Sequence, residues 1–282
     1  MYIFKHSADI IAYLQRQRKA GSKSGFVPTM GALHQGHLSL IDKAKSETDM
    51  VVCSIFVNPT QFNDPRDYAM YPKSVENDVL MLERAECNVL FLPDVLEIYP
   101  PGVNTKKHYA LGELESVLEG KYRPGHFQGV CRVMDRLMDI IKPDVLFLGQ
   151  KDFQQCMIIK KLFSLLEIKS GIEICPIERE VDGLAMSSRN RRLDPTEREK
   201  ATGICKTLSF VKENIHSGNL DKLIEEARQI LLSHDFKIDY IEAATVDRLQ
   251  SISSWDGKTE IVVLVAAYMG EVRLIDNIVI TA

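Results

Sequence analysis

The chain has 282 residues, roughly two domains at ~150 residues each, and its 45% hydrophobic and 26% charged residues exclude a disordered or fibrous protein. The net charge of −4, from 35 basic and 39 acidic residues, lacks the basic excess of a typical nucleic-acid-binding protein, so we expect no nucleic-acid partner. The longest apolar run, at 261–269, is far shorter than the ~20 residues of a membrane-spanning helix, and the charged N-terminal residues argue against a signal peptide. We therefore expect a cytoplasmic protein without a membrane partner.

Strand-like and helix-like segments alternate through the first two thirds of the chain. Short apolar segments predict strands at 25–29, 50–57, 88–92, 144–148 and 172–177. Helical spacing of apolar residues predicts helices at 7–20 with Ser7 as its cap, 37–48, 74–86 with Ser74 as its cap, 127–141 and 152–166. Strands separated by helices indicate right-handed βαβ units, so we predict an α/β fold with a Rossmann-like parallel sheet and flanking helices.

The last third of the chain has a different pattern. Asp194 to Glu197 combine an N-cap, a proline at the first helical position and an acid at the third, which predicts the start of a helix. A second helix is predicted at 220–233 and strands at 238–246, 259–267 and 272–280. These elements predict a small C-terminal α+β domain. We place the two domains at residues 1–177 and 178–282, and we expect the second, smaller domain to act as a lid over the first.

The first polar segment at a predicted strand end is PTMGALHQGH, residues 28–37. Ligands of open parallel sheets bind outside the carboxyl ends of the strands, and a helix N-terminus there offers free N–H groups to a phosphate. Gly31 and Gly36 allow close approach of the backbone. His34 and His37 are one turn apart and can point the same way as phosphate donors, although a helix cap or a pair of metal ligands are alternative interpretations.

Two further polar segments follow the second and fourth predicted strands. Gln61, in NPTQF, can donate and accept hydrogen bonds, which suits a carboxylate or hydroxyl substrate, although a loop amide more often bonds the backbone. Lys151, in GQKDFQQ, lies at a helix start, where its charge is unfavourable unless an anion binds there. Asp152 suits the same N-terminus as a cap, and Gln155 lies one turn further on.

The fourth polar segment is MSSRNRR, residues 186–192, which opens the second predicted domain. Its two hydroxyls and three guanidiniums predict an anion-binding loop, and a solvated basic turn is the alternative. Because the chain as a whole has a net negative charge, this basic cluster is stronger evidence for an anion-binding loop than it would be in a basic protein. The four segments together indicate a triphosphate held between the domains.

Five motifs, in chain order, resemble the pantothenate synthetase (pantoate–β-alanine ligase) family: FVPTMGALHQGH, SIFVNPTQF, RPGHFQGV, FLGQKDFQQ and DGLAMSSRN. PTMGALHQGH is similar to the HxGH phosphate-binding element of the nucleotidyltransferase superfamily, and MSSRN resembles the mobile second phosphate-binding loop of those enzymes. The matching motifs run from residue 25 to residue 192, while the C-terminal third has no sharp motif.

The resemblance implies an ATP-dependent condensation of pantoate with β-alanine through an enzyme-bound pantoyl adenylate, with release of AMP and pyrophosphate, by a homodimer. It implies catalytic roles for His37, His34 and Lys151. It implies ATP contacts from Met30, Gly31, Ala32, Leu33, His34, Gln35, Gly36, His37, Gly149, Gln150, Lys151, Asp152, Glu178, Met186, Ser187, Ser188 and Arg189. Gln61 and Gln155 would bind pantoate, Gln61 would also contact β-alanine, and Asp78 is the candidate for holding Mg²⁺.

Two positions depart from the family's pattern. Position 150 is Gln where such enzymes commonly carry Glu or Lys, and position 178 is Glu where many carry Val, although a backbone contact to adenine would survive at Glu178. Three alternative functions stay open: a nucleotidyltransferase that retains an adenylylated product, a nucleotide-sensing or RNA-binding module, and zinc binding by His34 and His37. Detection of free AMP, RNA binding or bound metal would distinguish them.

Overall fold

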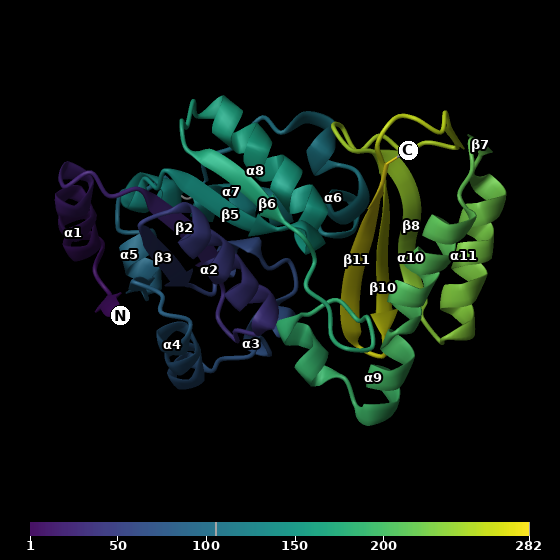
Figure 1. Ribbon diagram of the computed structural model, residues 1–282, viewed down its shortest axis with the longest axis horizontal. Helices are drawn as coiled ribbons and strands as arrows, with labels where there is room; N and C mark the ends of the chain where they lie inside the picture. The colour runs from purple at the N-terminus through teal and green to yellow at the C-terminus, as the bar shows by residue number, and fades with distance from the viewer. Residues whose placement is uncertain (105, 282) are drawn as a thin grey trace.

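The computed structural model describes residues 1–104 and 106–281, and its first part is built on a six-stranded parallel sheet (Figure 1). The strands lie in the order β1–β4–β3–β2–β5–β6. Their bounds are β1 Tyr2–Phe4, β2 Ser24–Thr29, β3 Met50–Ile55, β4 Val89–Phe91, β5 Val145–Gly149 and β6 Gly171–Cys175. The predicted Rossmann-like parallel sheet is confirmed, and the edge strand β1 is an addition that the sequence pattern did not indicate.

Helices cover both faces of this sheet. The helices of this part of the chain are α1 Ser7–Lys19, α2 Gln35–Glu47, α3 Pro65–Ala69, α4 Val75–Arg84, α5 Val95–Ile98, α6 Leu118–Tyr122, α7 His126–Ile141 and α8 Phe153–Leu165. Alternate residues of one strand point to opposite layers: in β5, Leu146 and Leu148 pack with α1, α7 and α8, while Phe147 packs with α2 and α4. Burial on both faces explains why the strands read as continuous apolar runs.

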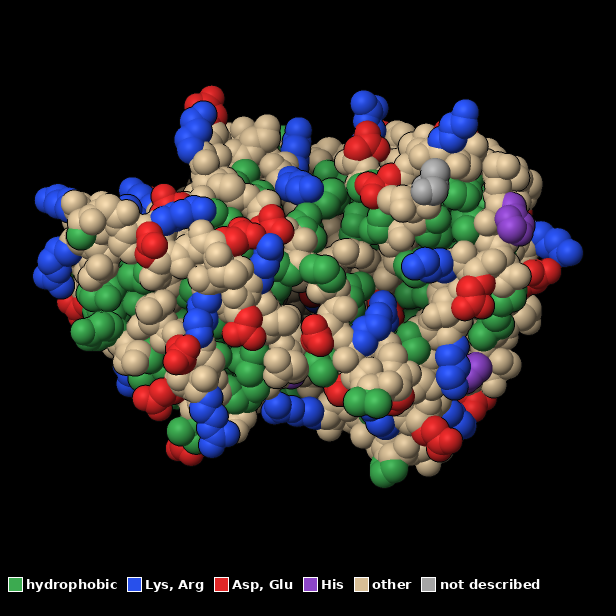
Figure 2. Space-filling view, in the orientation of Figure 1, with side chains coloured by type: hydrophobic (Ala, Val, Ile, Leu, Met, Phe, Trp, Pro, Cys, Tyr) green, Lys and Arg blue, Asp and Glu red, His purple; other side chains and the backbone are tan. Residues whose placement is uncertain are grey.

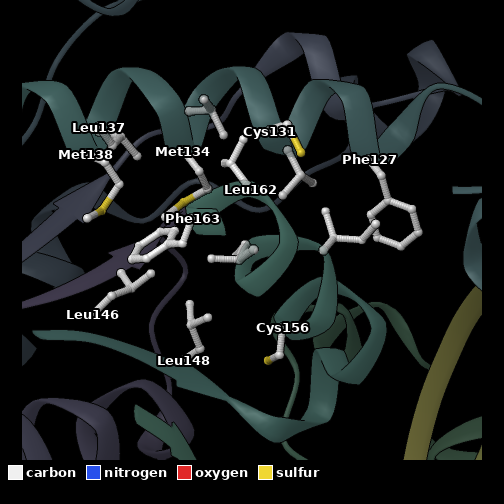
Figure 3. Close-up of a cluster of buried hydrophobic side chains, with 14 of the residues drawn as sticks. Phe127, Cys131, Met134, Leu137, Met138, Leu146, Leu148, Cys156, Leu162 and Phe163 are labelled. Carbon is white, nitrogen blue, oxygen red and sulfur yellow. The ribbon is translucent and has the colours of Figure 1, made fainter. Parts of the chain in front are cut away.

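The longest of these helices, α7, carries an apolar stripe that faces β5 and α8 (Figure 3). The residues drawn along it are Phe127, Cys131, Met134, Leu137 and Met138, and all are buried. This packing fixes the N-terminal end of α7, at His126, beside the carboxyl ends of the strands. None of the helices in the described part of the chain combines the length and the apolarity needed to cross a membrane.

Of the two predicted serine caps, Ser7 is wrong, while Ser74 has the predicted N-cap position but makes no cap hydrogen bond. Residue His6 occupies the N-cap position of α1, while the backbone N–H and the hydroxyl of Ser7 bond Glu97. Ser74 occupies the N-cap position of α4, but its hydroxyl donates to Asp78 Oδ1 at 3.0 Å rather than accepting from a helix N–H. The Ser7 hydroxyl thus donates to the backbone carbonyl oxygen of Glu97 and the Ser74 hydroxyl to the Asp78 carboxylate, and such tertiary or i+4 partners are not visible in a cap motif.

The last part of the chain forms a three-stranded antiparallel sheet in the order β11–β10–β8, and two helices cover its outer face (Figure 1). Its elements are η4 Ser188–Arg192, α9 Pro195–Ala201, α10 Gly203–Asn214, β7 Gly218–Asn219, α11 Asp221–Ser233, β8 Lys237–Thr245, β9 Ser254–Trp255, β10 Ile261–Met269 and β11 Val272–Ile280. The predicted capping box is confirmed, because Asp194 and Glu197 exchange side-chain-to-backbone hydrogen bonds. The helix that follows breaks at Thr202 into α9 and α10.

The two parts of the molecule share a hydrophobic core. Residues Val263, Val265 and Ala267 of β10 pack with α10 and α11. The alternate residues Val262, Leu264 and Ala266 belong to the same cluster as α7 and α8 of the first part. The apolar run at 261–269 is therefore a strand buried on both faces. A large apolar interface of this kind opposes wide relative motion of the two parts.

A buried ion-pair network also joins the two parts. Arg273 of β11 donates to both carboxylate oxygens of Glu119 at 2.7 and 2.8 Å and to Asp239 at 2.7 Å, and the Tyr240 hydroxyl donates to Glu119 at 2.8 Å. Burial acts to raise the pKa of Glu119, but the hydrogen bonds and charge of Arg273 outweigh it and lower that pKa to about 2. Glu119 is therefore ionised at neutral pH.

Replacing Glu119 with glutamine should lower the free energy of unfolding by about 3 kcal/mol at neutral pH, because it leaves Arg273 short of a buried counter-charge. The folded pKa of about 2 lies below the value of ~4.3 in an unfolded chain. This stabilisation is therefore fully present above about pH 4.3 and is lost as the pH falls toward 2. Urea titrations of both proteins at several pH values measure it. A stability difference that does not shrink in acid would contradict the assignment.

Candidate active site

A cleft lies where the strand order reverses. From β2 the chain builds outward through β3 and β4, then crosses back to place β5 on the other side of β2. Such a switch point opens a crevice at the carboxyl ends of the strands. Here it holds a cavity of about 230 Å³. Of the predicted site residues, the cavity is lined by Met30, His34, Gly36, His37, Gln61, Gly149, Lys151, Asp152, Gln155, Glu178, Met186, Ser187, Ser188 and Arg189.

The other predicted ATP contacts do not line this cavity. Ala32 and Leu33 are fully buried, and with Gly31 they form a bend that leads into α2. Gln35 is exposed at the start of α2. The side chain of Gln150 turns away to the C-terminal part, where its Nε2 donates to Asn277 at 3.2 Å. These residues shape the loops around the cleft instead of presenting side chains to it.

Asp78 does not fit the metal-binding role predicted for it. Its side chain is fully buried, and its two oxygens accept the backbone N–H groups of Ala32 and Leu33, each at 2.9 Å, in addition to the Ser74 hydroxyl. The carboxylate thus holds the bend before α2 and has no face open to an ion. Within residues 1–104 and 106–281, no three acidic, histidine or cysteine side chains gather as metal ligands would.

The two histidines at the start of α2 lie ring against ring. Their centroids are 4.1 Å apart, and His37 Nδ1 accepts the backbone N–H of His34 at 3.3 Å. Gly36 permits this arrangement, since a Cβ there would lie 3.0 Å from the ring of His34. With Nδ1 of His37 used as an acceptor, the proton of the neutral ring sits on Nε2. His37 therefore presents a donor to the cleft.

Both histidines are neutral at physiological pH. Burial, together with the nearby charges of Lys151 and Arg191, lowers the pKa of His34 to about 3 and that of His37 to about 4. Lys151 projects from the turn η3 Gln150–Asp152, which joins β5 to α8. The positive charge of the cleft thus comes from lysine and arginine, while the histidines are neutral and offer N–H groups.

The segment 187–192 is tied to the first part of the molecule through several side chains. Ser188 Oγ lies 3.1 Å from the Tyr71 hydroxyl, and Arg189 and Arg192 both bond Asp67, at 2.8 and 3.1 Å. Burial acts to raise the pKa of Asp67, but the hydrogen bond and charge of Arg189 hold it below its usual range. Ser187 accepts the N–H of Arg189 and caps the η4 turn. Asp67 thus neutralises part of the charge of the basic cluster.

The two predicted substrate amides lie in the same cavity but differ in how they are held. Gln61 Oε1 accepts from Asn58 Nδ2 at 3.0 Å, and its Nε2 faces Met30 Sδ at 3.2 Å. Gly129 of α7 lets the turn carrying Gln61 approach closely, because a Cβ there would lie 2.1 Å from the Thr60 carbonyl oxygen. Within the described residues, Gln155 forms no side-chain hydrogen bond, so its amide is available to a ligand.

Sequence reasoning missed a buried pair at the start of α7. Arg123 Nη1 lies 3.1 Å from His126 Nε2, and His126 Nδ1 lies 2.8 Å from the carbonyl oxygen of Gln61. Burial lowers the pKa of His126 to about 3, with a further contribution from Arg123, so the ring is neutral and accepts from the guanidinium. The motif RPGHFQGV contains both residues, but the sequence does not reveal that they meet Gln61.

A second, wider cavity of about 640 Å³ lies between the two parts of the molecule, and Figure 2 shows the surface hollowed at their junction. It shares Arg123, Lys151, Asp152, Ser187 and Arg189 with the first cavity. The shared residues form a basic boundary between a narrow inner chamber and an open vestibule.

Comparisons with known proteins agree with one another. The family model for pantoate–β-alanine ligase matches residues 2–279. The chain is 43% identical over 274 residues to a pantothenate synthetase of Bacteroides thetaiotaomicron, covering 96% of this chain and 95% of that protein, and 42% identical over 273 residues to one of Cytophaga hutchinsonii, covering 95% of each.

Solved structures give the same result. A pantothenate synthetase of Thermus thermophilus superposes with a TM-score of 0.90 at 36% identity and 99% coverage of both chains. The pantoate–β-alanine ligase of Francisella tularensis, complexed with β-γ ATP and β-alanine, superposes with a TM-score of 0.83 at 40% identity, covering 99% of this chain and 97% of that one.

Proposed function

The chain belongs to the pantoate–β-alanine ligase family and is an enzyme of that family, and from this premise we propose that it forms pantothenate in two steps. ATP and pantoate give an enzyme-bound pantoyl adenylate and pyrophosphate, and β-alanine then displaces AMP. The observation that carries this proposal is the meeting, in one cavity, of the HxGH turn, two substrate amides, Lys151 and the segment 186–189. The complex of the related Francisella ligase with β-γ ATP and β-alanine supports ATP as the co-substrate.

ATP would bind along the start of α2 and the turn η3. The free N–H groups of that helix N-terminus and the Nε2–H of His37 would face its phosphates. Lys151 would lie at the α-phosphate, with Ser187, Ser188 and Arg189 over the triphosphate. Glu178 would contribute only backbone to the adenine side, and its carbonyl oxygen already accepts the N–H of Met186 at 3.0 Å.

Pantoate would lie deeper in the cavity. Gln61 and Gln155 can pair with its carboxylate and hydroxyl groups. The wall beside them is apolar, formed by Val130, Val133 and Met134 of α7, and suits its dimethyl carbon. This placement brings the pantoate carboxylate toward the phosphates held at His37.

In the first step the pantoate carboxylate attacks the α-phosphorus of ATP, the α–β phosphoanhydride bond breaks, and pyrophosphate leaves with its electron pair. The substrate supplies the nucleophile, so the enzyme aligns two anions and stabilises the charge that develops on the phosphate oxygens. Lys151 supplies positive charge, and His34 and His37 supply neutral donors. The family implies Mg²⁺ with ATP, but Asp78 does not fit as its ligand, and we derive no step through a protein-bound metal.

In the second step the amine of β-alanine attacks the acyl carbon, and AMP departs with the electrons of the broken C–O bond. Arg123 lies at the boundary of both cavities. Its Nη1 faces His126 and Glu119, and its other N–H groups would receive the carboxylate of β-alanine entering from the vestibule. Exclusion of water protects the mixed anhydride. Because the parts at 1–177 and 178–282 share an apolar core, we assign the covering role to the segment 186–192 at the start of the second part.

Replacing Gln61 or Gln155 with alanine should mainly weaken pantoate binding, because an amide recognises carboxylate and hydroxyl groups rather than ATP. ATP affinity, measured without pantoate by calorimetry, should stay within about threefold, while the pantoate KM rises about tenfold or more, the loss expected for one hydrogen bond to a charged group. Gln154→Ala is unsuitable as a control because its amide holds Leu114 and Val117. Collapse of ATP binding with pantoate binding intact would overturn these assignments.

The whole proposal is tested by ATP turnover with pantoate, with and without β-alanine. We expect pyrophosphate exchange that needs pantoate alone and free AMP that appears only when β-alanine is added. A stable adenylylated product that survives β-alanine would instead identify a nucleotidyltransferase. The family resemblance also suggests a homodimer, which sedimentation at several concentrations tests.

A further inference from the structure

Asn277 of β11 reaches across from the C-terminal part to the turn that carries Lys151. Its Nδ2 donates to the carbonyl oxygens of Gln150 and Lys151, both at 3.0 Å, and its Oδ1 accepts from Gln150 Nε2 at 3.2 Å. The side chain is buried, and its backbone N–H bonds Asp276 Oδ1 at 2.8 Å. Every polar group of this amide is therefore committed to holding one turn.

The turn η3 Gln150–Asp152 has no side-chain cap of its own. Lysine carries its ammonium group on a flexible four-carbon stem, so the position of that group depends on how firmly the backbone is fixed. Two hydrogen bonds to consecutive carbonyl oxygens fix both the position and the orientation of this short turn. Asn277 supplies them from a distant part of the chain.

Asn277 is itself held rigidly on β11. Arg179 donates to both oxygens of the neighbouring Asp276, at 2.7 and 3.0 Å, and the Asp276 side chain is fully buried. Four residues before Asn277 on the same strand, Arg273 bonds Glu119 of the first part. The strand is thus anchored at several points along the boundary between the two parts.

We propose that Asn277 is a positioning residue for Lys151, so that the C-terminal strand sets the location of the cation at the α-phosphate. This inference rests on the proposed role of Lys151 in adenylate formation. An asparagine is required because it offers two N–H donors and one acceptor in one plane. Aspartate in its place would turn two oxygens toward the carbonyls of residues 150 and 151, and alanine would leave those carbonyls without these donors.

Asn277→Asp should reduce kcat for pantoate-dependent pyrophosphate exchange about 10- to 100-fold, the range seen when the support of a catalytic group is displaced. The KM for pantoate should stay within about threefold, since Gln61 and Gln155 lie elsewhere in the cavity. Asn277→Ala provides a second variant if the aspartate variant does not fold. Val263→Ala is the control for loss of stability, because Val263 lies on the face of β10 that packs with α10 and α11. We expect near-normal exchange from this variant at 25 °C.

A double-mutant cycle with Lys151→Ala decides between positioning and a general structural effect. If Asn277 acts through Lys151, adding Asn277→Asp to Lys151→Ala should change the remaining exchange rate less than about threefold. An additive loss in that background would overturn the inference while leaving the role of Lys151 intact. Near-normal exchange by Lys151→Ala alone would overturn the proposed role of the lysine, and the positioning inference with it.

Discussion

Replacing Lys151 with alanine should lower pantoate-dependent exchange of pyrophosphate into ATP by about 10²- to 10³-fold, with the protein still folded. That is the loss observed when one preorganised donor is removed from a site where charge develops. Lys151 lies on the shared boundary of the two cavities. Because Lys151 is the lysine that lines both cavities, its replacement by alanine removes a full positive charge from their boundary.

The loss caused by Lys151→Ala should be larger than a count of the basic side chains in the cleft suggests, because His34 and His37 are neutral. With the pKa of His34 at about 3 and that of His37 at about 4, neither ring carries charge in the ligand-free cleft at neutral pH. Asp67 binds Arg189 and Arg192, which reduces their field. Stabilisation of the α-phosphate therefore depends heavily on the lysine.

The matched control for this experiment is Lys161→Ala, because Lys161 is exposed on α8, the helix that follows the turn of Lys151. Exchange should be near normal in that variant. Circular dichroism and thermal melts establish that both variants are folded. Exchange by Lys151→Ala at more than about one tenth of the wild-type rate would reject the assignment of Lys151 to the α-phosphate, since the expected loss is at least 10²-fold.

The sequence carried enough information to place most of the site because parallel strands all end at one edge of the sheet. Met30, Gln61 and Lys151 each follow a strand that reads as an apolar run, so their meeting follows from the fold class. The segment 186–192 was placed at the cleft by its hydroxyl and guanidinium groups instead of by a strand end, since it opens the C-terminal part. Local pattern and fold topology were sufficient here.

Residues that act through tertiary contacts could not be found in this way. Asp78 was predicted to hold Mg²⁺ near the phosphates, and only the folded chain shows that its oxygens accept the N–H groups of Ala32 and Leu33. Asn277 lies in a third of the chain without a sharp motif, and its partners are the backbone carbonyls of residues 150 and 151. A backbone partner leaves no trace in the pattern of side chains.

The neighbouring glutamines show an intermediate case. Gln154 accepts from the backbone N–H of Glu119 and donates to two carbonyls, whereas Gln155 lines the cavity. The helical phase of the buried residues of α8 places 154 toward the core and 155 toward the cleft. The motif alone, with two consecutive glutamines, does not separate a structural amide from a substrate-binding one.

The efficiency of the second step should depend steeply on pH. Aminolysis needs the free amine of β-alanine, and an alkyl ammonium of the lysine type titrates near ~10.4. The fraction of free amine therefore rises about tenfold per pH unit through neutrality. If aminolysis limits turnover, kcat/KM for β-alanine should increase about 10³-fold between about pH 6 and 9.

Pyrophosphate exchange should be nearly flat over the same range, because the pantoate carboxylate stays ionised. An unperturbed histidine would titrate near ~6.5 and bend this profile. In the structure, burial lowers the pKa values of His34 and His37 to about 3 and about 4. Since a lowered pKa keeps each ring neutral until the pH falls well below 5, the histidines of the ligand-free enzyme contribute no inflection between about pH 6 and 9.

Both assays on one preparation separate the substrate amine from an enzyme group, with activity recovered at neutral pH as the control for denaturation. A steep rise for β-alanine beside a flat exchange profile assigns the dependence to the amine. Parallel profiles would mean that one enzyme group governs both steps, and this account of aminolysis would fail. A shared inflection near pH ~6.5 would point to a histidine whose pKa is raised by bound phosphate, because a nearby anion favours the protonated ring and counteracts the effect of burial.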